Sequence, residues 1–551
     1  MSASDKKKLR KEASAQLLTE KQLQQQKEAK KLKAYTIAFV TAMVLVVCIT
    51  LAVLGVRAVN NSGVFQNNTI AANVGENALS SVELSYFFTD EINAYYNEWY
   101  QTYSTYTDTY LQMLGWDTSK PLDEQFQNEE TNTTWAQYFL DAALDQAKND
   151  YALAAKAKEE GFELPAEDQT TLTNLLGNIE TYATLYGYRN AKQYLRAMYG
   201  YGSTPESYGE YYERSLLASA YAAAHHEGLT YENSKIRDYE ADKMAEFNSY
   251  TYTSAYMSYT YFQQGGTKDE NGNITYSEEE NAAARESMKA AADKLATATT
   301  DDELEAMVKE IAVKDGSSIS VTKNENLLYS GVSSSIREWL SSTDRKDGDI
   351  TAIANVSTTT NEDGTETELT NGYYVVIFHG VNDNATAMGN VRHLLVKFEG
   401  GTEDEETGEV TYSEAEKAAA KEEAEGYLKS WQEGDATEES FIALVKAHSD
   451  DSSASEGGLF EDIHRDSSYV DNFLNWSIDA ARKAGDVAVI ETEYGYHVMY
   501  FVGNSELTYR DYMITSEMRD SDHEAWYDAI VDAVTASLAD TSKMRLDVVL
   551  S

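Results

Sequence analysis

Histidine, serine and acidic side chains carry the most versatile chemistry in this chain, which has eight histidines and one cysteine. Ser449, Asp451 and His497 are the residue types of a hydrolase triad, but no G-x-S-x-G turn presents the serine as a nucleophile. His225 and His226 are adjacent, so on a helix they would point about 100° apart, and zinc would need further convergent ligands. Neither hydrolysis nor zinc chemistry is indicated, and we expect both adjacent histidines to be structural.

His497 belongs to a phrase that occurs twice. The chain contains GYHVMYF and, upstream, GYYVVIF, with Tyr374 in place of the histidine. FQQGGTKDENGNITYSEEENAAA from Phe262 likewise matches FEGGTEDEETGEVTYSEAEKAAA from Phe398. This self-similarity, at a spacing of 135 to 137 residues over most of its length, indicates two copies of one domain. Each copy is predicted to run from an opening strand through a turn and helices to a closing strand.

Several phrases of the second copy, in order, resemble a known family. They are VRHLLVKF from Val391, FIALVKAHSDDSSASEGGLFED from Phe441 and AGDVAVIETEYGYHVMYF from Ala484. Together they resemble a parvulin-type peptidyl-prolyl isomerase domain over Asn390 to Gly503. The whole chain resembles the PrsA and SurA class of extracytoplasmic foldases.

The resemblance implies a site without cofactor or metal. It consists of two facing histidines, a carboxylate and a hydroxyl near them, and an aromatic and an apolar residue of the proline pocket, namely His393, His497, Asp451, Thr492, Phe473 and Leu459. Two features depart from the family pattern. The usual GGDLG reads GGLFED, and the expected methionine before Phe473 is replaced near Tyr469 or Val470. We therefore expect an altered pocket shape.

Proline isomerisation needs only a light catalytic apparatus. Rotation about an X-Pro bond faces a barrier of roughly 18–20 kcal/mol, yet no bond is made or broken. An enzyme need only bind the twisted amide better than the planar one. Phe473 and Leu459 would form a slot for the ring, while His393, His497 and Asp451 would supply a hydrogen-bond network.

The first copy lacks these groups. Tyr374 replaces His497, Ile336 replaces Phe473, and either Met257 or Ser258 stands at His393. Lys314 or Asp315 takes the place of Asp451, depending on a one-residue gap. The glycines, the tryptophan and the apolar pattern remain. We expect an inactive domain that binds clients or acts as a spacer.

The N-terminal residues predict a membrane anchor. Residues 1–33 hold 10 of the 45 Lys and Arg residues but only 4 of the 92 acidic ones, so a basic tail precedes a strongly acidic body. Residues 34–56 carry no charge and are long enough to span a membrane, with the basic tail on the cytoplasmic side. A cleaved signal peptide is the alternative. Cys48 lies in this segment, so we expect no disulfide within the chain.

Residues 64–249 are predicted to be mostly helical and are rich in tyrosine, which either packs between helices or cradles unfolded clients. The sequence thus predicts an α+β fold with a single transmembrane helix, a helical SurA/PrsA-like chaperone domain and two tandem parvulin-like α/β domains, the first degenerate. The predicted boundaries are a cytoplasmic tail at 1–33, the membrane helix at 34–56, the chaperone-like domain at 64–249, the degenerate domain at 250–385, the isomerase domain at 386–505, and a C-terminal helix at 506–551 that packs on the chaperone domain.

The predicted function is that of a membrane-anchored foldase that isomerises X-Pro bonds in exported proteins and also acts as a chaperone. Its partners would be unfolded or partly folded exported chains. The body would lie outside a cell membrane of Gram-positive type, crossed once. Nucleic acid is not expected, because the body is acidic. The alternative is a non-catalytic holdase that uses its parvulin folds as binding modules. The clients and the oligomeric state are not indicated.

Overall fold

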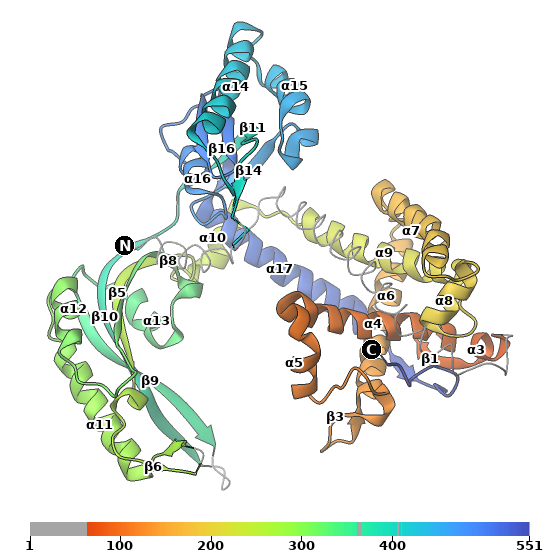
Figure 1. Cartoon of the computed structure of the whole chain (residues 1–551), viewed down its shortest axis with the longest axis horizontal. Coiled ribbons are helices and arrows are strands. Elements are labelled where there is room, and N and C mark those ends of the chain that lie inside the picture. The colour runs from red at the N-terminus through yellow and green to blue at the C-terminus, as the bar shows by residue number, and fades with distance from the viewer. Residues whose placement is uncertain (1–62, 271, 361–364, 405–406, 409, 550–551) are drawn as a thin grey trace. The chain divides into compact units, whose positions relative to one another are not determined.

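A computed structural model describes residues 63–549 except 271, 361–364, 405–406 and 409. Its chain divides into two compact units, and each is described by itself. The helical unit comprises the described residues up to Thr230 together with residues 517–549. The other unit comprises residues 231–516 and holds both copies of the repeat (Figure 1).

The helical unit is built on long amphipathic helices around a small antiparallel sheet of order β17-β1-β2. Its helices are α3 (Val64–Asn68), α4 (Ser81–Tyr103), α5 (Thr107–Met113), α6 (Trp135–Glu159), α7 (Ala166–Leu185), α8 (Ala191–Tyr199), α9 (Pro205–Gly228) and the C-terminal part of α17 (Tyr509–Val531). Its strands are β1 (Ile70–Val74), β2 (Asn77–Ser80), β3 (Phe126–Asn128), β4 (Thr133–Thr134) and β17 (Ala536–Leu538). Short 3-10 turns lie at η1 (Ser104–Tyr106) and η2 (Leu122–Glu124).

Tyrosine side chains of the helical unit both pack between helices and lie on the surface. Tyr86, Tyr199, Tyr208 and Tyr211 are buried and pack with ring centroids 5.0–6.0 Å apart. Buried tyrosine hydroxyls need partners, and Tyr211 donates to Asp90 at 2.7 Å. Other rings, such as that of Tyr106, are exposed. Ordinary helix packing therefore accounts for part of the tyrosine content only.

The C-terminal segment forms a helix and then a strand. α17 ends at Val531, before the end of the helix predicted for 506–551, and Ala536–Leu538 form β17, which pairs with β1. The β-branched pair Val534 and Thr535 favours extended backbone at this point. Trp526 and Ile530 of α17 pack against the α6 and α9 side chains of the same unit.

The two copies of the repeat fold as two α/β modules. The first module contains β5 (Ser249–Ser258), β8 (Ser320–Leu328), β9 (Ile350–Thr360), β10 (Glu366–Asn382), α11 (Glu278–Leu295), α12 (Asp301–Lys309) and α13 (Ser334–Ser341), with 3-10 turns η3 (Tyr259–Phe262) and η4 (Tyr329–Gly331). The second contains β11 (Ala387–Lys397), β14 (Leu459–Ile463), β15 (Val487–Thr492), β16 (Gly495–Thr508), α14 (Glu414–Glu433), α15 (Glu438–His448) and α16 (Asp471–Ser477), with η5 (Ser452–Glu456). α10 (Asn233–Ala241) precedes the first module.

Both modules have the same topology. The antiparallel sheets have the orders β8-β5-β10-β9 and β14-β11-β16-β15. Side chains alternate between the two faces of a strand, and each sheet is covered on both faces (Figure 1). In the second module α14 and α15 pack on the face of Leu394 and Val498, and α16 packs on the face of Val391 and Met499.

A shared hairpin explains the repeated phrase GGT…TYS. β6 (Thr267–Lys268) pairs with β7 (Ile274–Thr275), and β12 (Thr402–Glu403) pairs with β13 (Val410–Thr411). In each copy a serine caps the following helix. The side chain of the glutamate three residues later accepts a hydrogen bond from the backbone N–H of that serine. Glu280 also accepts from Gly266 N at 2.8 Å, and Glu416 from Gly401 N at 3.0 Å. In each copy, one glutamate carboxylate thus bonds both the hairpin and the start of the helix.

The predicted fold class, α+β with a single transmembrane helix, is wrong. Residues 63–549, apart from the gaps given above, form a mixed α/β structure that includes a parvulin-like module, and none of their helices is long and apolar enough to cross a membrane. The longest helices carry charges, as α4 does with Glu83, Asp90, Glu91 and Glu98. The predicted tail at 1–33 and the predicted span at 34–56 lie outside the described residues.

Candidate functional site

Two histidines face each other at the centre of the second sheet. His393 lies on β11 and His497 on the neighbouring β16, where His393 pairs with Met499 and Leu395 pairs with His497. The two histidines are therefore diagonal neighbours on one face. Their Nδ1 atoms are 2.9 Å apart, and their side chains are buried at 2% and 5% exposure.

A carboxylate and a hydroxyl stand behind His393. Asp451 caps η5, and its Oδ1 lies 3.5 Å from His393 Nε2. Ser453 Oγ donates to the same oxygen at 2.5 Å and lies 3.5 Å from His393 Nε2. Burial alone would raise the pKa of Asp451, but the bond and charge of His393, together with the bonds from Ser453, hold that pKa well below its usual range. Asp451 is therefore ionised at neutral pH.

Thr492 completes the other end of the network. Its Oγ1 lies 2.8 Å from His497 Nε2. Burial, followed by the repulsion of the neighbouring His393, lowers the pKa of His497 to about 3, so this ring is neutral. The two rings thus connect Thr492 to Asp451 through a continuous series of polar contacts, from Thr492 Oγ1 to His497 Nε2, from His497 Nδ1 to His393 Nδ1, and from His393 Nε2 to Asp451 Oδ1.

Aromatic side chains form the wall beside the histidines. The centroid of the Phe473 ring on α16 lies 5.3 Å from that of His393 and 5.6 Å from that of His497, and both pairs meet edge to face. The Phe460 ring on β14 lies 5.0 Å from His393, and Tyr469 contacts both phenylalanines. Phe460 and Tyr469 are partly exposed, which leaves an apolar surface next to the histidines.

The structure brings five of the six predicted residues together and leaves out Leu459. Leu459 pairs with Arg392, whose side chain reaches Glu438 on the α15 side of the sheet. Phe460, one residue on, pairs with Val391 and faces the histidines. Sequence reasoning missed both Phe460 and Ser453. Strand alternation after Gly458 was a signal for the first, and the second follows an Asp by two residues, as in a side-chain-closed turn.

The first module has neither histidine, and the pairing of its strands corrects the expected equivalences. His393 pairs with Met499 just as Ser254 pairs with Val376, so Ser254, and neither Met257 nor Ser258, occupies the position of His393. Tyr374 stands at His497 and packs on Tyr256 at 4.7 Å. Ile336 of α13 lies in the apolar cluster that corresponds to the cluster around Phe473. The hydrogen-bond network therefore has no counterpart there.

Within the described part of the chain, no group of three or more His, Cys, Asp or Glu residues is placed to hold a metal ion. The adjacent His225 and His226 lie on α9. The ring of His225 stacks on Trp526 at 3.8 Å, and His226 Nε2 lies 2.8 Å from Asp520 Oδ1.

Comparison with known proteins agrees with this geometry. Residues 393–503 match the Rotamase family model, described as a PPIC-type PPIASE domain. The second module is therefore a parvulin-type peptidyl-prolyl cis-trans isomerase domain, and peptides that contain proline are the substrates such a domain implies. No curated protein matches the chain.

Among solved structures, the chain is similar to peptidylprolyl isomerase (PrsA) from Bacillus anthracis, with 16% identity and a TM-score of 0.17. That similarity covers 27% of this chain and 59% of the other, so the match spans little more than half of that protein.

The low pKa of His497 predicts a pH-dependent stability of the second module. The ring has a pKa of about 3 in the folded module and about 6.5 when unfolded, so below pH 6.5 the unfolded state binds a proton that the folded state does not. Stability should therefore be full above pH 6.5 and fall by about 2 kcal/mol between pH 7 and pH 5.

Amide hydrogen exchange in β16 at the two pH values measures this effect. His497→Asn should remove most of the pH dependence. The exposed His448, on α15 of the same module, is the matched position, and His448→Asn should keep it. An unchanged pH dependence in His497→Asn would contradict the assignment of a neutral, buried ring.

Proposed function

We propose that the chain is a foldase that catalyses cis-trans isomerisation of X-Pro bonds in exported polypeptides. The observation that carries this proposal is the chain of hydrogen bonds from Thr492 through His497 and His393 to Asp451, beside Phe473. This chemistry does not require a nucleophile, because the reaction is a rotation.

The site residues suit a twisted amide. As the C–N bond rotates it loses resonance, and the proline nitrogen becomes a better hydrogen-bond acceptor while the ring needs an apolar surface. Phe473 and Phe460 supply that surface. The linked histidines supply a preorganised polar array in a site from which water is largely excluded, where electrostatic effects are strong. Binding that is tighter in the twisted state than in the planar state lowers the barrier.

Catalysis is assigned to the second module alone. Ser254 and Tyr374 of the first module cannot reproduce the histidine pair, although the sheet, the hairpin and the helices are retained. In this proposal the first module binds clients or acts as a spacer.

The location outside the cytoplasm is also a proposal, supported by the excess of Lys and Arg before residue 34 and the acidic body that follows. Protease added to intact cells should digest the body. Its complete protection would contradict this location.

The direct test is refolding of a protein whose slow phase is limited by proline isomerisation, in the presence of the full chain. That phase should accelerate in proportion to the concentration of the chain. Properly folded chain that leaves the rate unchanged would refute the isomerase function.

A holdase function is favoured by one further observation on the helical unit. Large apolar side chains stay exposed around the end of α4 and along α5, notably Tyr106 at 68% and Met113 at 75% exposure. Exposed apolar patches of this kind mark binding surfaces. We propose that they hold unfolded client segments.

The double variant Tyr106→Ser, Met113→Ser should bind an unfolded, proline-free client about tenfold more weakly, because each side chain contributes apolar area to the contact. Suppression of the client's aggregation measures this, and isomerase activity cannot contribute to it. Met244→Ser, which changes another exposed methionine (61%) that lies in the other unit, is the control. If the wild type, the double variant and Met244→Ser suppress aggregation equally, this surface does not bind the client.

A further inference from the structure

The loop between β14 and α16 connects the two aromatic residues that touch His393. This loop, residues 464–470, begins after the strand that carries Phe460 and ends before the helix that carries Phe473. Both rings lie close to His393, at 5.0 and 5.3 Å. Tyr469, within the loop, packs on both rings. A shift of the loop would therefore move the wall of the proline pocket.

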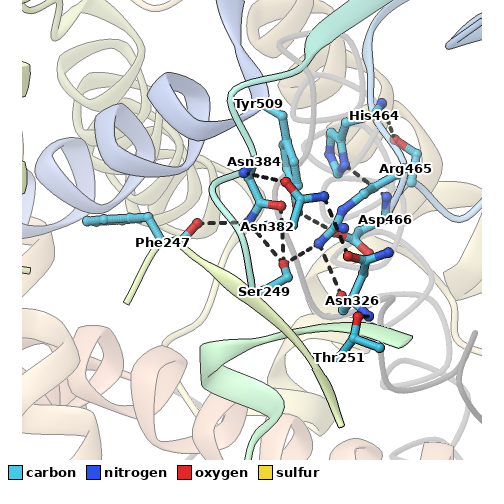
Figure 2. Close-up of polar contacts among 11 residues, drawn as sticks. Phe247, Ser249, Thr251, Asn326, Asn382, Asn384, His464, Arg465, Asp466 and Tyr509 are labelled. Atoms are coloured by element: carbon cyan, nitrogen blue, oxygen red, sulfur yellow. Dashed lines mark hydrogen bonds and ion pairs between the residues drawn. The ribbon is translucent and has the colours of Figure 1, made fainter. Parts of the chain in front are cut away.

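Arg465 fastens this loop to the first module. Its Nη2 donates to Ser249 Oγ, at the start of β5, and to the backbone oxygen of Asn326 on β8 at 3.1 Å. Figure 2 shows the guanidinium reaching these two strands. Ser249 is fully buried and is itself held by Asn384 Nδ2 at 3.0 Å, which also donates to Phe247 O at 2.8 Å.

The same loop is braced from its other side by the first residue of α17. The ring of His464 stacks on Tyr509 at 4.2 Å with an angle of 11° between planes. Tyr509 donates to Asp466 Oδ2 at 2.8 Å, and the same oxygen lies 3.3 Å from Arg465 Nε. These contacts hold the guanidinium between two neighbours rather than leaving it free to rotate (Figure 2).

The anchor on the first module is itself fixed. Arg510, next to Tyr509, donates through Nη1 to Asn248 Oδ1 and to Asp383 O, both at 2.8 Å, and it pairs with Glu240 of α10. The segment that enters the first module and the segment that leaves it are thereby tied together. Charge-assisted hydrogen bonds of a buried guanidinium are strong. The bonds of Arg510 therefore hold in place the part of the first module that Arg465 contacts.

We propose that Arg465 is a positioning residue through which the first module, which lacks the histidine pair, sets the geometry of the proline pocket in the second. The first module would then be part of the working enzyme as well as a client-binding or spacer element. This inference rests on the proposed isomerase function, because the consequence it describes is a change in that activity.

The test uses kcat/KM of the full chain with a proline-containing peptide. Arg465→Ala and Ser249→Ala should each lower kcat/KM. We expect a loss of about 5- to 20-fold for Arg465→Ala, because a misplacement of about 1 Å can cost about 100-fold and a smaller displacement of binding groups costs less. The double variant should have the same kcat/KM as Arg465→Ala, since both changes break the same connection between the modules.

Arg285→Ala is the matched control. This arginine also bonds a backbone oxygen, that of Thr370, but within the first module alone, and its removal should leave kcat/KM unchanged.

Three outcomes would overturn the proposal: activity of folded Arg465→Ala within twofold of wild type, a loss in Arg465→Ala with none in Ser249→Ala, or losses that multiply in the double variant. The ring-proton NMR signals of His393 and His497 give a readout that does not depend on turnover. They should shift in both single variants and stay in place in Arg285→Ala. Inactive wild type would refute the isomerase function, and the NMR signals would then still decide whether the modules are coupled.

Discussion

Replacing both site histidines, His393→Ala with His497→Ala, should lower kcat/KM for proline isomerisation by about 100-fold in the full chain. The pair forms the centre of the hydrogen-bond chain beside Phe473, with 2.9 Å between the two Nδ1 atoms. Without the rings, Thr492 and Asp451 no longer share a connected network. The apolar wall would remain, so the peptide should still bind, and the loss should fall mainly on kcat.

The control for this experiment is His448→Ala. His448 lies in the same module, at the end of α15, and its exposed ring stacks on Tyr427 away from the site. Its removal should leave the rate within about twofold, as expected for surface substitutions. Full activity in a folded double variant would show that the histidines are dispensable, and catalysis would then have to be sought elsewhere in the chain.

The largest effect on stability is expected from Gly458→Ala. Gly458 has φ of +65°, and its carbonyl accepts from His393 N at 3.0 Å. A Cβ at this position would lie 2.2 Å from the His393 backbone oxygen, which cannot move without breaking the sheet. The left-handed backbone costs about 1–2 kcal/mol for alanine, and the clash adds about 1–3 kcal/mol. The melting temperature of the second module should fall by roughly 10 °C or more.

Gly485→Ala separates these two contributions. Gly485 also has a positive φ, +91°, but a Cβ there would meet nothing within 4 Å. The stability of this variant should therefore fall only by the contribution of backbone strain. Thermal unfolding followed by amide exchange in β11 measures both variants. Equal losses in the two would show that the close approach to His393 contributes nothing.

The register of β5 shows where sequence comparison failed. Counting back from Phe262 and Phe398 made Met257 or Ser258 the equivalent of His393, whereas strand pairing makes Ser254 its equivalent. The first copy has extra residues between its strand and Phe262, and they fold as the 3-10 turn η3. Such a turn leaves no mark in the apolar pattern, so the alignment passed through it without a gap.

Leu459 and Phe460 show the same limit at the site. Both are apolar and adjacent, and which of them faces the histidines depends on the parity of the strand relative to β11. A change of one residue reverses every side chain of a strand. The tight approach of Gly458 to His393 sets that parity, and it is a tertiary contact.

By itself, the sequence determined the two α/β copies, the loss of both histidines from the first, and the residues Phe473, Asp451, His497, His393 and Thr492 of the site. The two copies are recorded in local patterns of apolar spacing and in repeated phrases, whereas the site residues were implied by the resemblance of short phrases to the parvulin family. Only the tertiary structure decided that Ser453 and Phe460 join the site, and that Arg465 links it to the first module. Those contacts join residues distant in sequence, and their geometry depends on strand register and turn conformation, which local patterns do not encode.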